Sequence, residues 1–105
     1  MTATFRAYVL KKALKLVSAD RAEDHGDALE NLTAIADLWT THLRARYQVG
    51  FQLTPADVAD LMELLKIARR MSHQGRANDD NYIDAAGYAA LGYEMVRATW
   101  KKPRV

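Results

Sequence analysis

The chain has 105 residues, 50% of them hydrophobic and 27% charged, and its formal net charge of +2 gives no indication of nucleic-acid binding. It contains no cysteine, which excludes disulfides, thiolate catalysis and cysteine-based metal sites. No apolar run reaches the ~18 residues that span a bilayer, and the first residues lack the pattern of a signal peptide, so we expect a cytoplasmic protein with no membrane partner.

Apolar residues recur with helical spacing through the first half of the chain. They predict a first helix over about residues 3–19 and a second over residues 27–47. On the second helix, Leu32, Ala36 and Trp39 share an apolar face, and Thr40 falls on the polar one. A polar turn that contains His25 and Gly26 separates the two helices.

The start of a third helix is marked clearly. Thr54, Pro55 and Asp57 fit an N-cap, a proline at the first helical position and an acid at the third. This helix should run over residues 55–71. After a connection with Gly75, a fourth helix is predicted over residues 80–100, capped by Asp79 or Asp80.

The fourth helix is apolar almost all round, so it needs cover on more than one side. A second subunit is one source of that cover. Four aromatic side chains surround this helix and either pack in the core and a dimer contact or stack on a base: Tyr82, Tyr88, Tyr93 and Trp100. The pattern predicts an all-α, four-helix bundle-like single domain over residues 1–105 that forms a homodimer.

Acidic residues fall near the apolar sector of the third and fourth helices. On a helical wheel, the apolar centre of the third helix consists of Val58, Leu61, Leu64, Leu65 and Ala68, while Lys66 and Arg70 lie on the far face. Asp57 and Asp60 lie beside that centre, and Asp80 and Asp84 form a second pair on the fourth helix. Grouped carboxylates repel one another unless a cation joins them.

The sequence therefore predicts a Mg²⁺ or Mn²⁺ site between the third and fourth helices, because such ions take carboxylate oxygens and bridge to phosphates. The predicted metal ligands are Asp57, Asp60, Glu63, Asp80 and Asp84. Asp60 and Asp84 are the predicted catalytic acids. Lys66 and Arg69 are expected to contact the phosphates of a nucleotide or another phosphorylated small molecule.

Structural roles are the alternative for each acid. Asp57 completes a capping box, and Asp80 is a helix cap or a partner of the helix dipole. Asp60 and Asp84 could form buried pairs with Arg69 or another base, and Glu63 could pair with Lys66 on the surface. The three histidines, His25, His42 and His73, have no zinc-ligand spacing.

The acidic pairs resemble the all-α nucleoside triphosphate pyrophosphohydrolases of the MazG and dimeric dUTPase type. The signature of that superfamily is Glu-x-x-Glu followed by Glu-x-x-Asp on the next helix. Here Asp57-x-x-Asp60 or Asp60-x-x-Glu63 would be the first pair, and Asn81-x-x-Asp84 the second. The chain departs from the signature by offering mainly aspartates and an asparagine. The resemblance implies Mg²⁺-dependent hydrolysis between the α and β phosphates.

A closer resemblance is to short phage and prophage proteins of unknown function, over roughly residues 12–94. It rests on these segments: Asp20-Arg21, Ile35-Ala36-Asp37-Leu38-Trp39, Thr54-Pro55-Ala56-Asp57-Val58, Leu65-Lys66-Ile67-Ala68-Arg69 and the stretch from Asp80 to Tyr88. For such a protein the compartment would be the host cytoplasm. Two alternatives to the enzyme stay open, namely a nucleotide binder without turnover and a small helical adaptor or regulator whose aspartates are structural.

Overall fold

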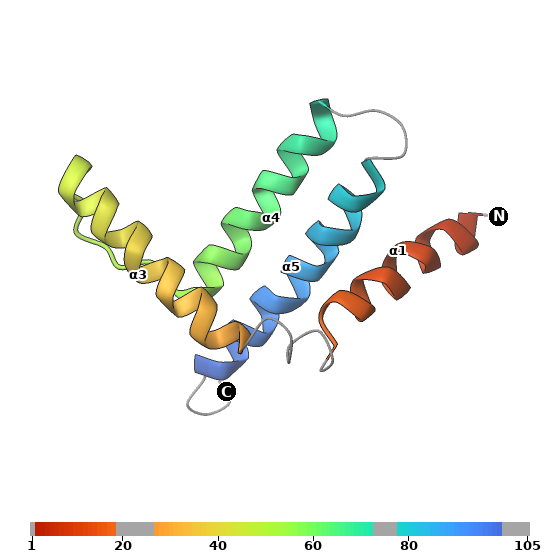
Figure 1. Cartoon of the computed structure of the whole chain (residues 1–105), viewed down its shortest axis with the longest axis horizontal. Helices are drawn as coiled ribbons and strands as arrows, with labels where there is room; N and C mark the ends of the chain where they lie inside the picture. The colour runs from red at the N-terminus through yellow and green to blue at the C-terminus, as the bar shows by residue number, and fades with distance from the viewer. Residues whose placement is uncertain (1, 19–26, 73–77, 100–105) are drawn as a thin grey trace, which may run out of the picture.

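The computed structural model describes residues 2–18, 27–72 and 78–99, and every regular element in those ranges is a helix (Figure 1). The helices are α1 (Thr2–Leu16), α3 (Ala28–Tyr47), α4 (Pro55–Ser72) and α5 (Asn78–Thr99). The all-α prediction is confirmed, and each predicted helix end lies within three residues of the observed one. Several residues singled out in the sequence lie outside the described ranges: Asp20, Arg21, His25, Gly26, His73, Gly75 and Trp100. No described helix is long and apolar enough to cross a membrane.

The helices form an open bundle in which α5 lies between α4 and α1 (Figure 1). Helices α4 and α5 run antiparallel and in contact along their length, while α3 crosses the start of α4 and then diverges from it. Two sides of the apolar α5 are thus covered within the chain, by α4 and by α1. Val17, just after α1, packs against α5 at Gly87, where an added Cβ would lie 3.6 Å from Val17 Cγ1.

The core sits where α3, α4 and α5 meet. Its buried members are Leu32, Ala36, Val58, Ala59 and Met95, and Trp39 and Leu53 pack against them at half burial. The apolar face predicted for the second helix therefore turns inward at Leu32 and Ala36. Fully burying a side chain of the size of Val58 or Met95 stabilises the fold by about 1.5–3 kcal/mol.

Thr40 belongs to this interior, so its placement on a polar face is wrong. The residue is 2% exposed. Its Oγ1 donates to the Ala36 carbonyl at 2.7 Å and accepts from the Leu53 amide at 2.9 Å. Arg44 also donates to the Phe51 carbonyl, at 3.3 and 3.2 Å. These bonds hold residues 48–54 along α3 and set the point at which α4 begins.

Of the five residues that the wheel placed at the apolar centre of α4, only Val58 is buried, and the other four are exposed. Ala59 and the charged Lys66 and Arg70 turn toward α5, whereas Leu61 and Leu64 are exposed. The expectation that Lys66 and Arg70 lie on the far face is therefore wrong. Both side chains carry long apolar stems that can lie along a neighbouring helix while the charge finds a partner at its edge.

The first prediction concerns the start of α4. The Thr54 amide donates to Asp57 Oδ2 at 2.9 Å, and the Asp57 amide donates to Thr54 Oγ1 at 3.1 Å. Thr54→Ala removes half of this capping box and should lower the free energy of unfolding by about 1 kcal/mol. Thermal melting should show a fall of about 4–8 °C. Thr33→Ala, at an exposed position inside α3, is the matched control and should not lower the melting temperature, because alanine has the higher helix propensity.

A second prediction concerns the approach of α4 to α5. A Cβ at Gly92 would lie 3.2 Å from Asp60 Oδ1 and 3.6 Å from Ala59 Cβ. Gly92→Leu must push α4 aside and should cost about 1–3 kcal/mol of stability in urea unfolding. Ala89→Leu places the same side chain at an exposed position of α5 and should change stability by less than about 0.5 kcal/mol. Equal costs for the two variants would contradict the close approach.

Candidate functional site

Asp57 forms the capping box at the start of α4 together with Thr54. Its Oδ2 accepts the Thr54 amide within the capping box, and its side chain is half-buried. This geometry is the structural role that the sequence offered as the alternative to metal binding. A carboxylate held this way stabilises the first turn of α4 by satisfying an amide that has no partner inside the helix.

Asp84 has a positive partner within the chain. Its Oδ2 lies 3.1 Å from Lys66 Nζ, and the two side chains are 32% and 14% exposed. The ion pair joins α4 to α5. The Lys66 ammonium supplies the positive charge that the sequence analysis assigned to a divalent cation at Asp84. The Lys66 ammonium has three N–H donors, so the contact with Asp84 does not use all of them.

Three of the four remaining predicted residues lie nearer to solvent. Asp60, Asp80 and Arg69 are exposed, and Glu63 is half-buried. Asp60 lies beside Gly92 near the end of α5, whereas Asp80 is in the first turn of that helix. Twelve residues of helix separate Gly92 from Asp80, which is about 18 Å along the axis.

The antiparallel register explains this separation. Lys66 meets Asp84 and Arg70 meets Tyr82, so successive residues of α4 meet earlier and earlier residues of α5. Asp57 and Asp60 therefore lie level with the second half of α5, away from Asp80 and Asp84. Within residues 2–18, 27–72 and 78–99, no group of three or more His, Asp or Glu side chains could hold a metal ion.

One polar arrangement at the connected end of α4 and α5 was not predicted. The Arg70 guanidinium lies 4.3 Å from the centre of the Tyr82 ring, a cation–π geometry. Next to it, Asn81 is 3% exposed, and its Nδ2 donates to Asn78 Oδ1 at 3.4 Å. The signal was available in the sequence, because Arg70 and Tyr82 lie at similar distances from the connection and must meet in an antiparallel pair.

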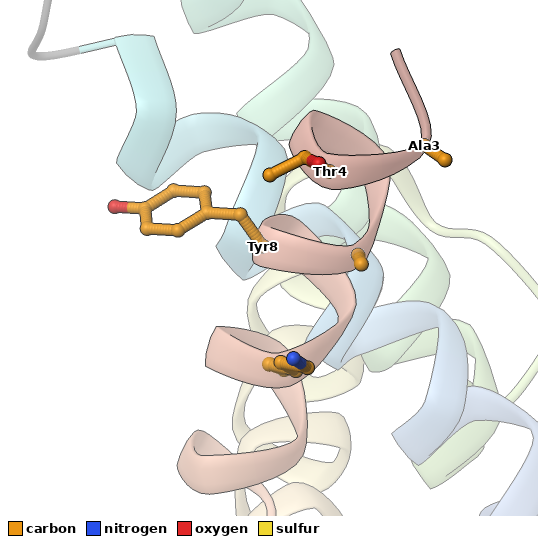
Figure 2. Close-up of a pocket in the computed structure, with 5 residues that line it drawn as sticks. Ala3, Thr4 and Tyr8 are labelled. Atoms are coloured by element: carbon orange, nitrogen blue, oxygen red, sulfur yellow. The ribbon is translucent and has the colours of Figure 1, made fainter. Parts of the chain in front are cut away.

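A shallow hollow on α1 is lined by Ala3, Thr4, Ala7, Tyr8 and Lys11 (Figure 2). All five residues come from one helix, and none is acidic. Lys12 Nζ lies 5.7 Å from the centre of the Tyr8 ring, whose hydroxyl points away from α1 in Figure 2. Because all of its lining residues come from one helix, the hollow can contact a ligand on one side only. It is therefore not an alternative location for the predicted metal site.

Comparison with known proteins places the chain in a family. The family model described as "Domain of unknown function (DUF6378)" matches residues 8–96. The chain belongs to this family. The match covers most of the chain, from within α1 to near the end of α5.

Two relatives of the chain come from phages, which confirms the resemblance to phage proteins. Over 87 residues the chain is 42% identical to the Gene 55 protein of Mycobacterium phage L5, covering 83% of this chain and 51% of that protein. Over 81 residues it is 35% identical to the Gene 55 protein of Mycobacterium phage D29, covering 77% of this chain and 48% of that protein. The chain thus spans about half the length of these curated relatives. No solved structure matches it.

The pairing of Lys66 with Asp84 yields a third prediction. A double-mutant cycle with Lys66→Ala and Asp84→Ala should give a coupling energy of about 0.5–1 kcal/mol, because the pair is partly shielded from water. The coupling is measured by urea unfolding at low and high salt and should fall at high salt. A cycle with Glu63→Ala and Lys66→Ala is the control and should show little coupling. A larger coupling for Glu63 would assign Lys66 to the wrong carboxylate.

Proposed function

We propose that this chain is a phage-type helical adaptor that acts by binding other proteins and carries out no catalysis. The observation that supports this most is the exposure of the most apolar face of α4, including Leu61, Leu64 and Leu65. A helix usually directs such a face into a core. Large apolar patches that stay exposed on a folded chain are typical of interaction surfaces.

The overall dimensions support the same proposal. The accessible surface is 8110 Å², whereas a compact monomer of 11.8 kDa has about 5,900 Å². The radius of gyration is 15.7 Å, against about 13 Å expected for 105 residues. A chain of this size that folds around its own core is more compact. These dimensions favour a protein that completes its packing with a partner.

The roles of the acids also favour an adaptor. Asp57 caps α4 and Asp84 pairs with Lys66. Each carboxylate thus stabilises the helices that carry it. A protein whose aspartates are structural and whose apolar residues are exposed has its binding energy in hydrophobic contact, which is the chemistry of protein–protein recognition.

A second candidate is a Mg²⁺-dependent nucleoside triphosphate pyrophosphohydrolase or a nucleotide binder without turnover. It is favoured by Asp60 and Glu63, which are three residues apart on α4 and retain access to solvent. Mg²⁺ often takes only one or two protein carboxylates and completes its shell with waters and substrate phosphates. An exposed Arg69 is available for such phosphates. The resemblance to the MazG-type signature points the same way.

Thermal melting with Mg²⁺ or Mn²⁺ and a panel of nucleoside triphosphates separates the two candidates and is the fourth prediction. The adaptor predicts no shift in melting temperature with any combination. A metal-dependent nucleotide site predicts a stabilisation of about 2.7 kcal/mol when the ligand is at 100 times its dissociation constant. In that case Asp60→Ala and Glu63→Ala should abolish the shift, and Glu30→Ala on α3 should retain it. Pyrophosphate release would then distinguish hydrolysis from binding alone.

A further inference from the structure

We propose that the outer face of α1 binds an amphipathic helix of a partner protein that carries a row of acidic side chains. This surface, called the α1 face, consists of an apolar row and a basic row beside it. The apolar row is Ala3, Ala7, Leu10 and Leu14, and the basic row is Lys11 and Lys15. The inference rests on the proposed adaptor function and deepens it, because it states the chemistry of one partner.

The position of α1 leaves this face uncovered. Helix α1 packs on α5 and lies at the edge of the bundle (Figure 1). Ala13 is buried and Val9 is half-buried, which marks the side of α1 that faces the rest of the chain. At about 100° per residue, the centre of the α1 face lies on nearly the opposite side of the helix. Leu10 is 65% exposed and Leu14 is 67% exposed.

The apolar row has the spacing of a helix that packs against a second helix. Its members follow one another at intervals of four, three and four residues, which is the spacing of the a and d positions in a heptad. Two of the four are alanines. Small side chains at such positions allow the axis of a second helix to come close.

The shallow hollow on α1 lies over these alanines (Figure 2). Besides Ala3, it is lined by Thr4, Ala7, Tyr8 and Lys11, which are residues i, i+3, i+4 and i+7 of one helix. Four residues in this arrangement form the hole that takes a single side chain of a facing helix. The hollow therefore has the form of a socket for one apolar side chain of the partner.

The charge of α1 selects an acidic partner. Thr2–Leu16 contains four bases, Arg6, Lys11, Lys12 and Lys15, and no acid, which gives a net charge of +4. Helices α3 and α4 each carry as many acids as bases. Among the described residues, no carboxylate forms an ion pair with Lys11 or Lys15. Lysines beside an apolar row match a helix that has acids beside its own apolar row.

Other anionic partners match the α1 face less well. A bilayer surface takes up a helix through one broad apolar side. Phe5, the most exposed apolar side chain of α1, lies nine residues from Leu14 and therefore half a turn round the helix. A nucleic acid would contact the lysines through its phosphates but would leave Leu10 and Leu14 in water. A partner helix covers both rows.

The α1 face also gives the adaptor a second docking surface. Helix α5 lies between α1 and α4, so the α1 face and the leucine face of α4 belong to helices on opposite sides of α5 (Figure 1). The leucine face of α4 is apolar, whereas the α1 face is apolar and basic. Two surfaces of different chemistry allow one chain to hold two different proteins, which is what an adaptor does.

Fluorescence anisotropy with a labelled synthetic peptide tests this inference and is the fifth prediction. The probe is a helix of about three heptads with leucine at a and d and glutamate at e and g, because these glutamates keep it from pairing with itself. The full chain should bind this peptide at least about tenfold more tightly than the same peptide with lysine in place of each glutamate. The affinity should fall as salt is raised.

Variants of the chain locate the binding site. Lys11→Glu should raise the dissociation constant at least about tenfold, because it places an acid against acids. Lys12→Glu makes the same charge change outside the α1 face and should raise it less than about threefold. Leu10→Gln should weaken binding, and Leu38→Gln on α3, at a position 69% exposed, is its matched control. All four residues are exposed, so each variant should keep its helical circular dichroism.

Three outcomes would overturn the proposal for the α1 face. One is equal binding of the two peptides, or no binding of either. Another is binding of the glutamate peptide that Leu64→Gln on α4 weakens and Lys11→Glu does not. A third is tighter binding to duplex DNA, or to vesicles of phosphatidylcholine and phosphatidylglycerol, than to the glutamate peptide.

The adaptor proposal can fail separately. It rests on the leucine face of α4, so the first two of these outcomes leave it standing. A nucleotide-dependent shift in melting temperature that Asp60→Ala abolishes would overturn the adaptor, whichever peptide the chain binds.

Discussion

The rotation of α4 against α5 is the constraint on which the rest of the structure depends. It is set at three levels along the pair, by Ala59 against Gly92, by the ion pair of Lys66 with Asp84, and by Arg70 over Tyr82. Small residues allow close backbone approach at one level, and long cationic side chains span the gap at the others. Once this face of α4 is used, its leucines must point outward and its acids cannot reach Asp80.

Features that depend on a few neighbouring residues could be predicted from the sequence. Thr54 and Pro55 mark the start of α4 because a capping box and an N-terminal proline act within one turn. The periodic apolar residues of α3 gave both its bounds and its buried side at Leu32 and Ala36. The burial of Thr40 was not predicted because its partner, the Leu53 amide, lies thirteen residues away in a segment without a periodic pattern.

The candidate site could be predicted only in part, because a helical wheel gives angles but not neighbours. It placed Asp57 and Asp60 correctly beside the leucines and then assumed that the leucines face α5. The wheel angles assigned Lys66 and Arg70 to the far face, although their stems pack as well as many apolar side chains. The register of an antiparallel pair adds a second constraint. Counting residues from the connection between the two helices separates Asp60 from Asp84 on the sequence alone.

The apolar pattern of α4 fits the adaptor proposal, in which a partner buries the face that this chain leaves exposed. A seam such as Leu61, Leu64, Leu65 is unfavourable in water, and at about 25 cal/mol for each Å² removed from water its burial favours association. Within this chain, α4 contributes Val58 to the core, while Leu61, Leu64 and Leu65 stay exposed. The two faces of α4 therefore have different roles. The face with Lys66 and Arg70 packs against α5, and the leucine face is available to a partner.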